Sequence, residues 1–253
     1  MGASTSAGAA LDYRSSLDAL RSAQKPSRGT AAYSRLVNRP IARRVAAAAH
    51  QVGMTPNVAT AISAALSATG LVLLATRPPS WLLGIAVAGL LAAGYVMDSV
   101  DGQLARLTGS GSVSGEWLDH TVDCVKTCGL HLAVLVAWYR FPPVDERAWL
   151  LVPLGFEIVD MVTFFGLIVL PLLRRLQTGA PPAASDATRE HPLRQWIILP
   201  TDYGVFCLVF LVVGWPIGFL VAYSLLFLVN SAVLVLALTK WWRELAAFSR
   251  AEA

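Results

Sequence analysis

Four aspartates within a short stretch of the chain have the types and spacing to do chemistry: Asp98, Asp101, Asp119 and Asp123. The first two are three residues apart and the last two are four apart, so on helices each pair lies on one face. The run between the pairs is rich in Gly and Ser, which predicts a turn. Two helices joined by this turn would direct four carboxylates into one space.

Four ionised carboxylates in one space carry a formal charge of −4, which two divalent cations would balance. Oxygen ligands suit Mg²⁺ or Mn²⁺, and Mg²⁺ commonly completes its coordination shell with substrate phosphate. Two such ions about 4 Å apart form a clamp for in-line displacement at phosphorus. A single aspartate at a helix start is usually a cap, but four at these spacings favour a metal site.

The residues between and beside the aspartates favour a phosphate-containing ligand. Gly102 and Ala105 continue the face of Asp101 and carry almost no side chain, so a bulky ligand could approach the backbone there. The guanidinium of Arg106 suits a phosphate partner. Gly115 lies on the same predicted helix face as Asp119.

These residues carry a family resemblance. The signature of the CDP-alcohol phosphatidyltransferases is similar to the pattern Asp98-x2-Asp101-Gly102-x2-Ala105-Arg106-x8-Gly115-x3-Asp119-x3-Asp123. All eight fixed positions and their spacing match. The resemblance implies transfer of a substituted phosphate from a CDP-linked alcohol to the hydroxyl of an acceptor alcohol, with release of CMP.

The resemblance also implies residue roles. Asp98, Asp101, Asp119 and Asp123 would hold two Mg²⁺ or Mn²⁺ ions, and Asp123 would be the base that accepts the proton of the attacking hydroxyl. A homodimer is common in the family, so the resemblance implies one here.

A second set of residues would bind the cytidine diphosphate by the same resemblance. It comprises Gly102, Ala105, Arg106 and Gly115 of the motif. The run from Thr55 to Thr60 also resembles the Pro-Asn-x-x-Thr entry to the family's first spanning helix, so Asn57 and Thr60 would help to hold the nucleotide. From the residues alone, Pro56 followed by Asn57 is an ordinary helix start.

The motif does not identify the acceptor alcohol. Glu116 and His120 resemble the choline/ethanolamine phosphotransferase branch, and His120 could help to deprotonate an acceptor because its unperturbed pKa lies near neutrality. Alternatively, the two side chains only pair with each other at i, i+4 spacing. Cys124 stands where many phosphatidylinositol-phosphate-type members have a basic residue, which argues against a phosphorylated inositol.

CDP-diacylglycerol is the favoured donor, since a lipid can enter between helices from the bilayer. The alternative is a CDP-choline/ethanolamine-type reaction with a diacylglycerol-like acceptor.

Composition predicts an all-α integral membrane protein. The chain is 55% hydrophobic and only 14% charged, with a mean hydropathy of +0.57, whereas a soluble domain has about 25% charged residues. Six apolar segments each approach the ~20 residues that a spanning helix needs. They cover roughly 58–76, 81–103, 117–139, 148–173, 196–214 and 215–238.

The chain divides into three predicted parts. Residues 1–32 are expected to be a disordered tail, 33–240 the membrane domain, and 241–253 a tail. The domain opens with an amphipathic helix at 33–51 that lies on the membrane. The net charge of +4 is attributed to contact with anionic membrane lipids and not to nucleic acid.

Lys and Arg residues predict the orientation in the cell membrane. Those before the first segment are Arg14, Arg21, Lys25, Arg28, Arg35, Arg39, Arg43 and Arg44. More lie between the fourth and fifth segments and after the sixth, so both termini and the aspartate-rich site are expected on the cytoplasmic side.

Intramembrane ionisable groups raise further questions. Lys126 is expected either to pair with Glu157 or Asp160 or to line an acceptor pocket.

Two rival functions also use acidic clusters: a membrane prenyltransferase and a divalent-cation transporter. The first would hold its aspartates on well-separated helices, and the second would continue polar residues across the bilayer. Neither pattern matches this sequence.

Overall fold

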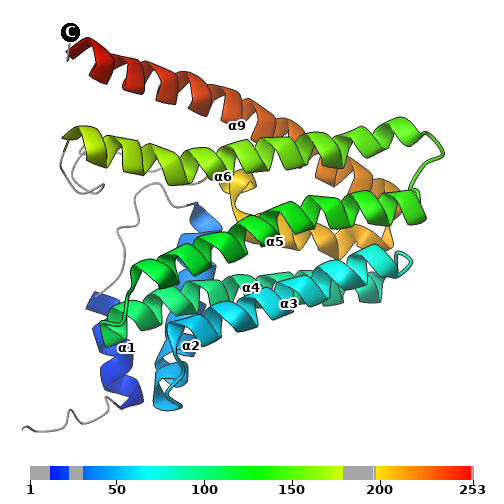
Figure 1. Cartoon of the computed structure of the whole chain (residues 1–253). Coiled ribbons are helices and arrows are strands. Elements are labelled where there is room, and N and C mark those ends of the chain that lie inside the picture. The colour runs from blue at the N-terminus through cyan, green and yellow to red at the C-terminus, as the bar shows by residue number, and fades with distance from the viewer. Residues whose placement is uncertain (1–11, 23–30, 179–195, 197, 252–253) are drawn as a thin grey trace, which may run out of the picture.

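The computed structural model describes residues 12–22, 31–178, 196 and 198–251, and those residues form an all-α bundle (Figure 1). Five of its helices are long and apolar enough to cross a bilayer, which makes the chain an integral membrane protein. They are α3 (Pro56–Thr76), α4 (Trp81–Thr108), α5 (Val113–Arg140), α6 (Leu151–Thr178) and α9 (Pro216–Ala251).

The segment predicted to span the membrane at 196–214 is shorter than expected. It consists of α8 (Tyr203–Val209) followed by the 3₁₀ helix η4 (Phe210–Gly214). The helix begins only after Asp202, whose Oδ1 accepts a hydrogen bond from the backbone N–H of Gly204 at 2.8 Å. The described residues therefore contain five long spans and one short apolar helix, not six equal spans.

The N-terminal region is helical. The helix predicted at 33–51 is present as a π-helical turn, η1 (Ser34–Asn38), that continues into α2 (Arg39–Gln51). A second helix, α1 (Tyr13–Ser22), lies within the tail expected to be disordered, and that expectation is wrong for these residues. The buried side chain of Leu20 packs α1 against α2 and α4. Hydrophobic contact with the membrane domain therefore orders this short helix.

The last helix, α9, extends beyond the sixth predicted segment at 215–238 and continues as far as Ala251. Near this end α9 is joined to α6 by Arg174, which donates to both carboxylate oxygens of Glu244 at 2.5 and 2.7 Å. Between the fourth and fifth predicted segments, the Pro, Gly and small polar residues from Thr178 to His191 predict a loop. Apart from Thr178, this stretch lies outside the described residues.

The bundle is packed on one side around α3, which contacts both α4 and α5. A Cβ atom at Gly94 of α4 would lie 2.5 Å from the Oγ of Ser67 in α3, so any larger residue would force the serine side chain or the helices to shift. The Oγ of Ser63 donates to the Gly94 carbonyl at 2.8 Å across the same contact. This close packing brings the start of α3 to the aspartates of α4.

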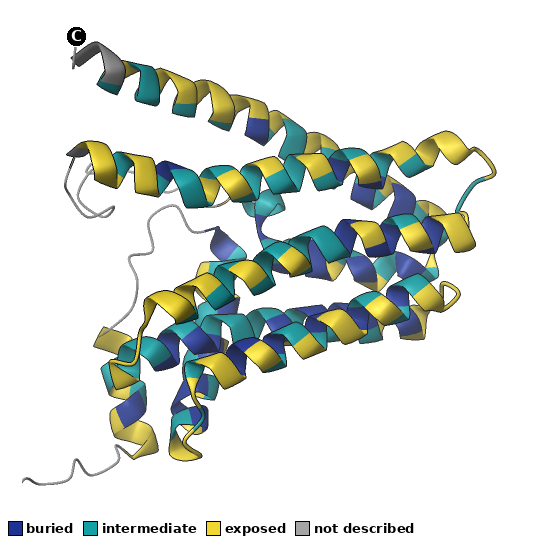
Figure 2. Ribbon diagram, in the orientation of Figure 1, coloured by how far each residue is buried: buried dark blue, intermediate teal, exposed yellow. Residues whose placement is uncertain are grey.

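On the other side, α5, α6, α8 and α9 share an aromatic core. Its central members are Phe156, Phe206, Phe210 and Tyr223, all buried. The outer faces of the long helices are mostly exposed in Figure 2 and carry large apolar side chains. Such faces suit contact with lipid chains.

Candidate metal and nucleotide site

The turn between α4 and α5 ends one helix and starts the other. Gly109 adopts a positive φ of 64° at the end of α4, a conformation that glycine reaches without steric cost. The side chain of Ser112 then caps α5 by accepting a hydrogen bond from the backbone N–H of Gly115 at 3.0 Å. As predicted, this Gly/Ser-rich run places the last turns of α4 beside the first turns of α5.

Asp101 of α4 and Asp119 of α5 form the first carboxylate pair. Asp101 is only 6% exposed, and its Oδ2 accepts a hydrogen bond from the Thr60 hydroxyl at 2.6 Å. The Asp119 carboxylate lies close enough to Asp101 to interact with it directly. Its Oδ1 is buried and has no hydrogen-bond partner among the described residues. A buried acid oxygen in this condition is an available ligand for a cation.

Asp98 and Asp123 form the second pair, with Lys126 between them. The Lys126 Nζ lies 2.7 Å from Asp123 Oδ1, contacts Asp98 Oδ1, and donates to Ser63 Oγ at 3.2 Å. The two carboxylates also lie side by side. The structure thus brings all four aspartates together from two helices, and it adds a lysine to the cluster.

Neither predicted acidic partner holds Lys126. Asp160 of α6 instead forms a 2.9 Å hydrogen bond with His131 Nε2, and Glu157 lies beside Cys128. Lys126 follows Asp123 by three residues, so the same helix face carries both side chains. This spacing was a signal in the sequence for the contact that forms.

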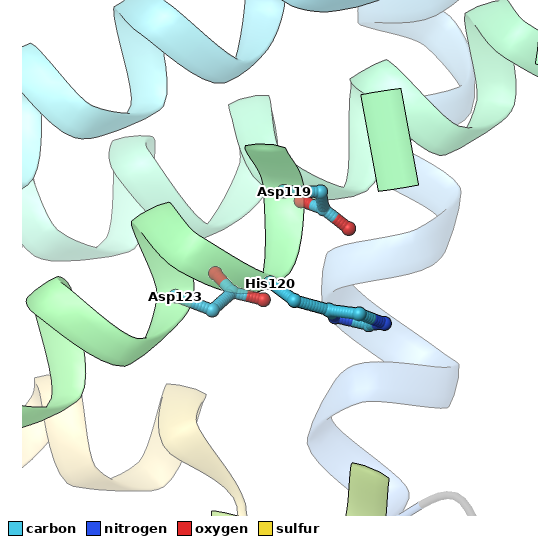
Figure 3. Close-up of side chains that lie close together, drawn as sticks. All are labelled: Asp119, His120 and Asp123. Carbon is cyan, nitrogen blue, oxygen red and sulfur yellow. The ribbon is translucent and has the colours of Figure 1, made fainter. Parts of the chain in front are cut away.

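His120 lies at the edge of the carboxylates. One ligand atom from each of Asp119, His120 and Asp123 lies within 4.8 Å of the others, and Figure 3 shows the three side chains on α5. The His120 Nε2 is 4.0 Å from Glu116 Oε1, and both side chains are exposed. The imidazole is therefore placed either to accept a proton or to serve as a ligand.

The predicted nucleotide residues border the same space. A Cβ atom at Gly115 would lie 3.6 Å from Asn57 Oδ1, so the starts of α3 and α5 adjoin there. A Cβ atom at Gly102 would lie 3.3 Å from Arg106 Nη1. The half-buried Ala105 accepts a hydrogen bond from the backbone N–H of Ser110 at 3.2 Å near the end of α4. Small residues thus keep the backbone of both helices open to a ligand.

Arg106 supplies positive charge beside the carboxylates. Its Nε is buried and has no hydrogen-bond partner in the part of the chain that the structure describes. It interacts electrostatically with Asp101 and with Arg39 of α2. Two guanidinium groups close enough to interact with each other favour an anion such as a pyrophosphate beside them.

The donor set fits divalent cations. Aspartate oxygens from two helices, one of them buried without a partner, are the hard ligands that Mg²⁺ and Mn²⁺ prefer. The imidazole of His120 would also be tolerated by Mn²⁺. A pyrophosphate bound near Arg106 would complete such a shell.

The long apolar helices and this acid-rich site together define an integral membrane enzyme. Residues 53–242 match the model of the CDP-alcohol phosphatidyltransferase family, and the chain belongs to this family. It is therefore a transferase of phospholipid biosynthesis, as the motif predicted.

Two similar solved structures are of the Mycobacterium tuberculosis phosphatidylinositol phosphate synthase PgsA1, one in complex with manganese and citrate and one with CDP-DAG bound. Each is 26% identical in sequence and aligns with a TM-score of 0.52 over 81% of this chain. The alignments cover 89% and 94% of the PgsA1 chains, respectively. No curated protein sequence matches the chain.

Proposed function

We propose that the chain transfers a substituted phosphate from CDP-diacylglycerol to the hydroxyl of an acceptor alcohol and releases CMP. The observation that carries the proposal is the convergence of four aspartates from α4 and α5 beside Arg106. The family match and the CDP-DAG bound to PgsA1 support the choice of donor. Asp98, Asp101, Asp119 and Asp123 would hold two Mg²⁺ or Mn²⁺ ions, in keeping with the manganese in the other PgsA1 complex.

When bound, the cations would supply charge neutralisation at the phosphates of the donor. The chain's own residues would position the reactants. Arg106 would bind a phosphate oxygen, and Asn57 and Thr60 would hold the nucleotide at the start of α3. Gly102, Ala105 and Gly115 would let the cytidine diphosphate approach the helix backbones.

Residues of α5 would accept the proton of the attacking hydroxyl. The acceptor oxygen forms a bond to the donor phosphorus as the bond from phosphorus to the CMP oxygen breaks. Asp123 would take the hydroxyl proton, with His120 beside it as a second proton acceptor. Lys126 would hold the Asp123 carboxylate in place through the 2.7 Å contact.

The predicted membrane topology and assembly belong to the same proposal. The site would face the cytoplasm, where a water-soluble nucleotide product can leave, and both termini would lie on that side. The α2 helix would lie on the membrane surface, and the enzyme would act as a homodimer.

The test measures CMP release by the purified protein from CDP-diacylglycerol, with Mg²⁺ or Mn²⁺ and a panel of acceptor alcohols. We expect activity that a chelator abolishes, and an Asp123→Asn variant that is folded and inactive. A parallel reaction with CDP-choline and diacylglycerol tests the alternative donor. CMP release by Asp123→Asn near the wild-type rate would refute the assigned base, and turnover of CDP-choline alone would refute the proposed donor.

A further inference from the structure

A cavity of about 570 Å³ opens between α5, α6, α8 and α9, next to the aspartate cluster. Its lining includes Tyr95, which precedes Asp98 by three residues, and Thr127, which follows Asp123 by four. Each of these residues lies about one helical turn from an aspartate of the cluster. The cavity therefore begins where an acceptor hydroxyl would have to meet the donor phosphorus.

A chain of hydrogen bonds leads from the aromatic core to the wall of this cavity. Tyr223 Oη lies 2.6 Å from His131 Nδ1, and His131 Nε2 lies 2.9 Å from Asp160 Oδ2. An ionised Asp160 carboxylate only accepts hydrogen bonds, so Nε2 carries a hydrogen. A neutral imidazole then accepts from the tyrosine hydroxyl at Nδ1. Both Tyr223 and His131 are buried, at 0% and 1% exposure. They hold the Asp160 carboxylate in one orientation.

Asp160 presents acceptor capacity to the cavity. It lines the space with a side chain that is 28% exposed. A carboxylate has about four lone-pair positions, and the bond from His131 uses one of them. Asn230 and Tyr203 line the same cavity, and the buried Tyr203 Oη has no hydrogen-bond partner among the residues described. The Asn230 Nδ2 already donates to two backbone carbonyl oxygens at 2.9 and 3.4 Å. The wall therefore offers the remaining lone pairs of Asp160 as acceptors and the Tyr203 hydroxyl as a donor.

The charge of the wall discriminates between ligands. Of the described residues that line the cavity, none is Lys or Arg, while Asp160 and Asp202 both line it. A phosphate or carboxylate would meet like charge from Asp160 and Asp202. A lipid chain would leave the Tyr203 hydroxyl and the remaining Asp160 lone pairs without partners, which is also unfavourable. A ligand with several uncharged hydroxyl groups satisfies both donors and acceptors.

We infer that this cavity binds the acceptor and that the acceptor is an uncharged polyhydroxy alcohol. Asp160 is then a specificity-determining residue, because its carboxylate accepts hydrogen bonds from the hydroxyl groups of the alcohol. The inference rests on the proposed function, because it assigns the second substrate of the same reaction. His131 and Tyr223 are positioning residues that act through Asp160.

The first experiment uses the wild-type enzyme with CDP-diacylglycerol and Mn²⁺. CMP release is measured with glycerol and myo-inositol, and separately with glycerol 3-phosphate and inositol phosphate. We expect the uncharged alcohols to stimulate release and the phosphorylated ones to have no effect. Stimulation by the phosphorylated alcohols alone, or by neither set, overturns the inference.

The second experiment compares Asp160→Asn with Glu157→Gln. Glu157 lies one turn away on α6 and does not line the cavity, so its variant is a matched loss of one carboxylate. Because a hydrogen bond to a charged group is worth about tenfold to about a hundredfold in binding, Asp160→Asn should raise the KM for the uncharged alcohol by that factor. We expect kcat and the KM for the donor to stay unchanged. Glu157→Gln should leave all three values at the wild-type level.

Two readouts separate this inference from the proposed function. Calorimetry of Mn²⁺-dependent CDP binding tests the nucleotide site without any acceptor, and absent binding would refute the proposed function itself. Intact CDP binding together with an unchanged acceptor KM in Asp160→Asn would overturn only the inference. If that variant does not fold, Tyr223→Phe gives the answer, because loss of the His131 partner should raise the acceptor KM about threefold to tenfold.

Discussion

Replacing Lys126 by Met should make the protein depend on divalent cations for its stability. The Nζ lies 2.7 Å from Asp123 Oδ1 and also contacts Asp98, in a side chain that is only 11% exposed. At an effective dielectric constant of about 20, the attraction across 2.7 Å is about 6 kcal/mol for one pair. Removal of the lysine charge also removes its desolvation cost, so the net loss of stability should be about 3–5 kcal/mol.

The measurement is thermal unfolding in detergent, with chelator and with added Mn²⁺. In chelator, Lys126→Met should unfold well below the wild type because two adjacent carboxylates lose their cation. Added Mn²⁺ should raise its unfolding temperature more than it raises that of the wild type, since the metal supplies the missing charge and binds only the folded site. Lys240→Met changes an exposed lysine of α9 and is the matched control. Equal stability of Lys126→Met and wild type in chelator, with equal responses to Mn²⁺, would refute the reasoning.

Two further substitutions test the packing that positions the cluster. Thr60→Val removes the 2.6 Å hydrogen bond to Asp101, so the Mn²⁺ affinity measured by calorimetry should fall about tenfold. The control is Thr69→Val, which alters an exposed hydroxyl bonded to its own helix and should leave the Mn²⁺ affinity unchanged. Equal affinity in both variants would contradict a role for this bond. Gly94→Ala should lower the free energy of unfolding by about 1–3 kcal/mol, because its Cβ would lie 2.5 Å from a serine oxygen of α3. Gly89→Ala, at a site with no atom within 4 Å, should be neutral or stabilising, and equal effects of the two alanines would refute the close-approach argument.

The sequence predicted the features that depend on local spacing. The i, i+3 and i, i+4 relations among Asp98, Asp101, Asp119 and Asp123 hold on any helix, so their grouping needed only the turn between them. The helix at 33–51 was predicted for the same reason. These relations do not require knowledge of how the helices pack.

The features that depend on packing were harder to predict. The late start of α8 follows from the capping role of Asp202, which also accepts a hydrogen bond from the backbone N–H of Ser34 at 2.9 Å, far away in the sequence. Helix α1 is ordered by the burial of Leu20 against elements that come later in the chain. A hydropathy profile does not reveal either contact, because both join residues that are far apart in the sequence.

One pattern on α5 connects the two halves of the site and was present in the sequence. Asp119, Asp123, Thr127 and His131 follow one another at intervals of four residues. At about 100° per residue, each interval turns the side chain by about 40° around the helix, so the stripe rotates by about 120° along its length.

That rotation carries the polar stripe from the side facing Asp101 of α4 to the side facing Asp160 of α6. A helix with this stripe can present a metal site to one neighbour and an acceptor cavity to the other, about one turn apart. A strict heptad repeat would instead keep all four side chains on one seam. The spacing of polar residues on α5 therefore joins the aspartate cluster to the cavity. Thr127 lies between the two and lines the cavity, so its substitution should weaken acceptor binding more than it weakens metal binding.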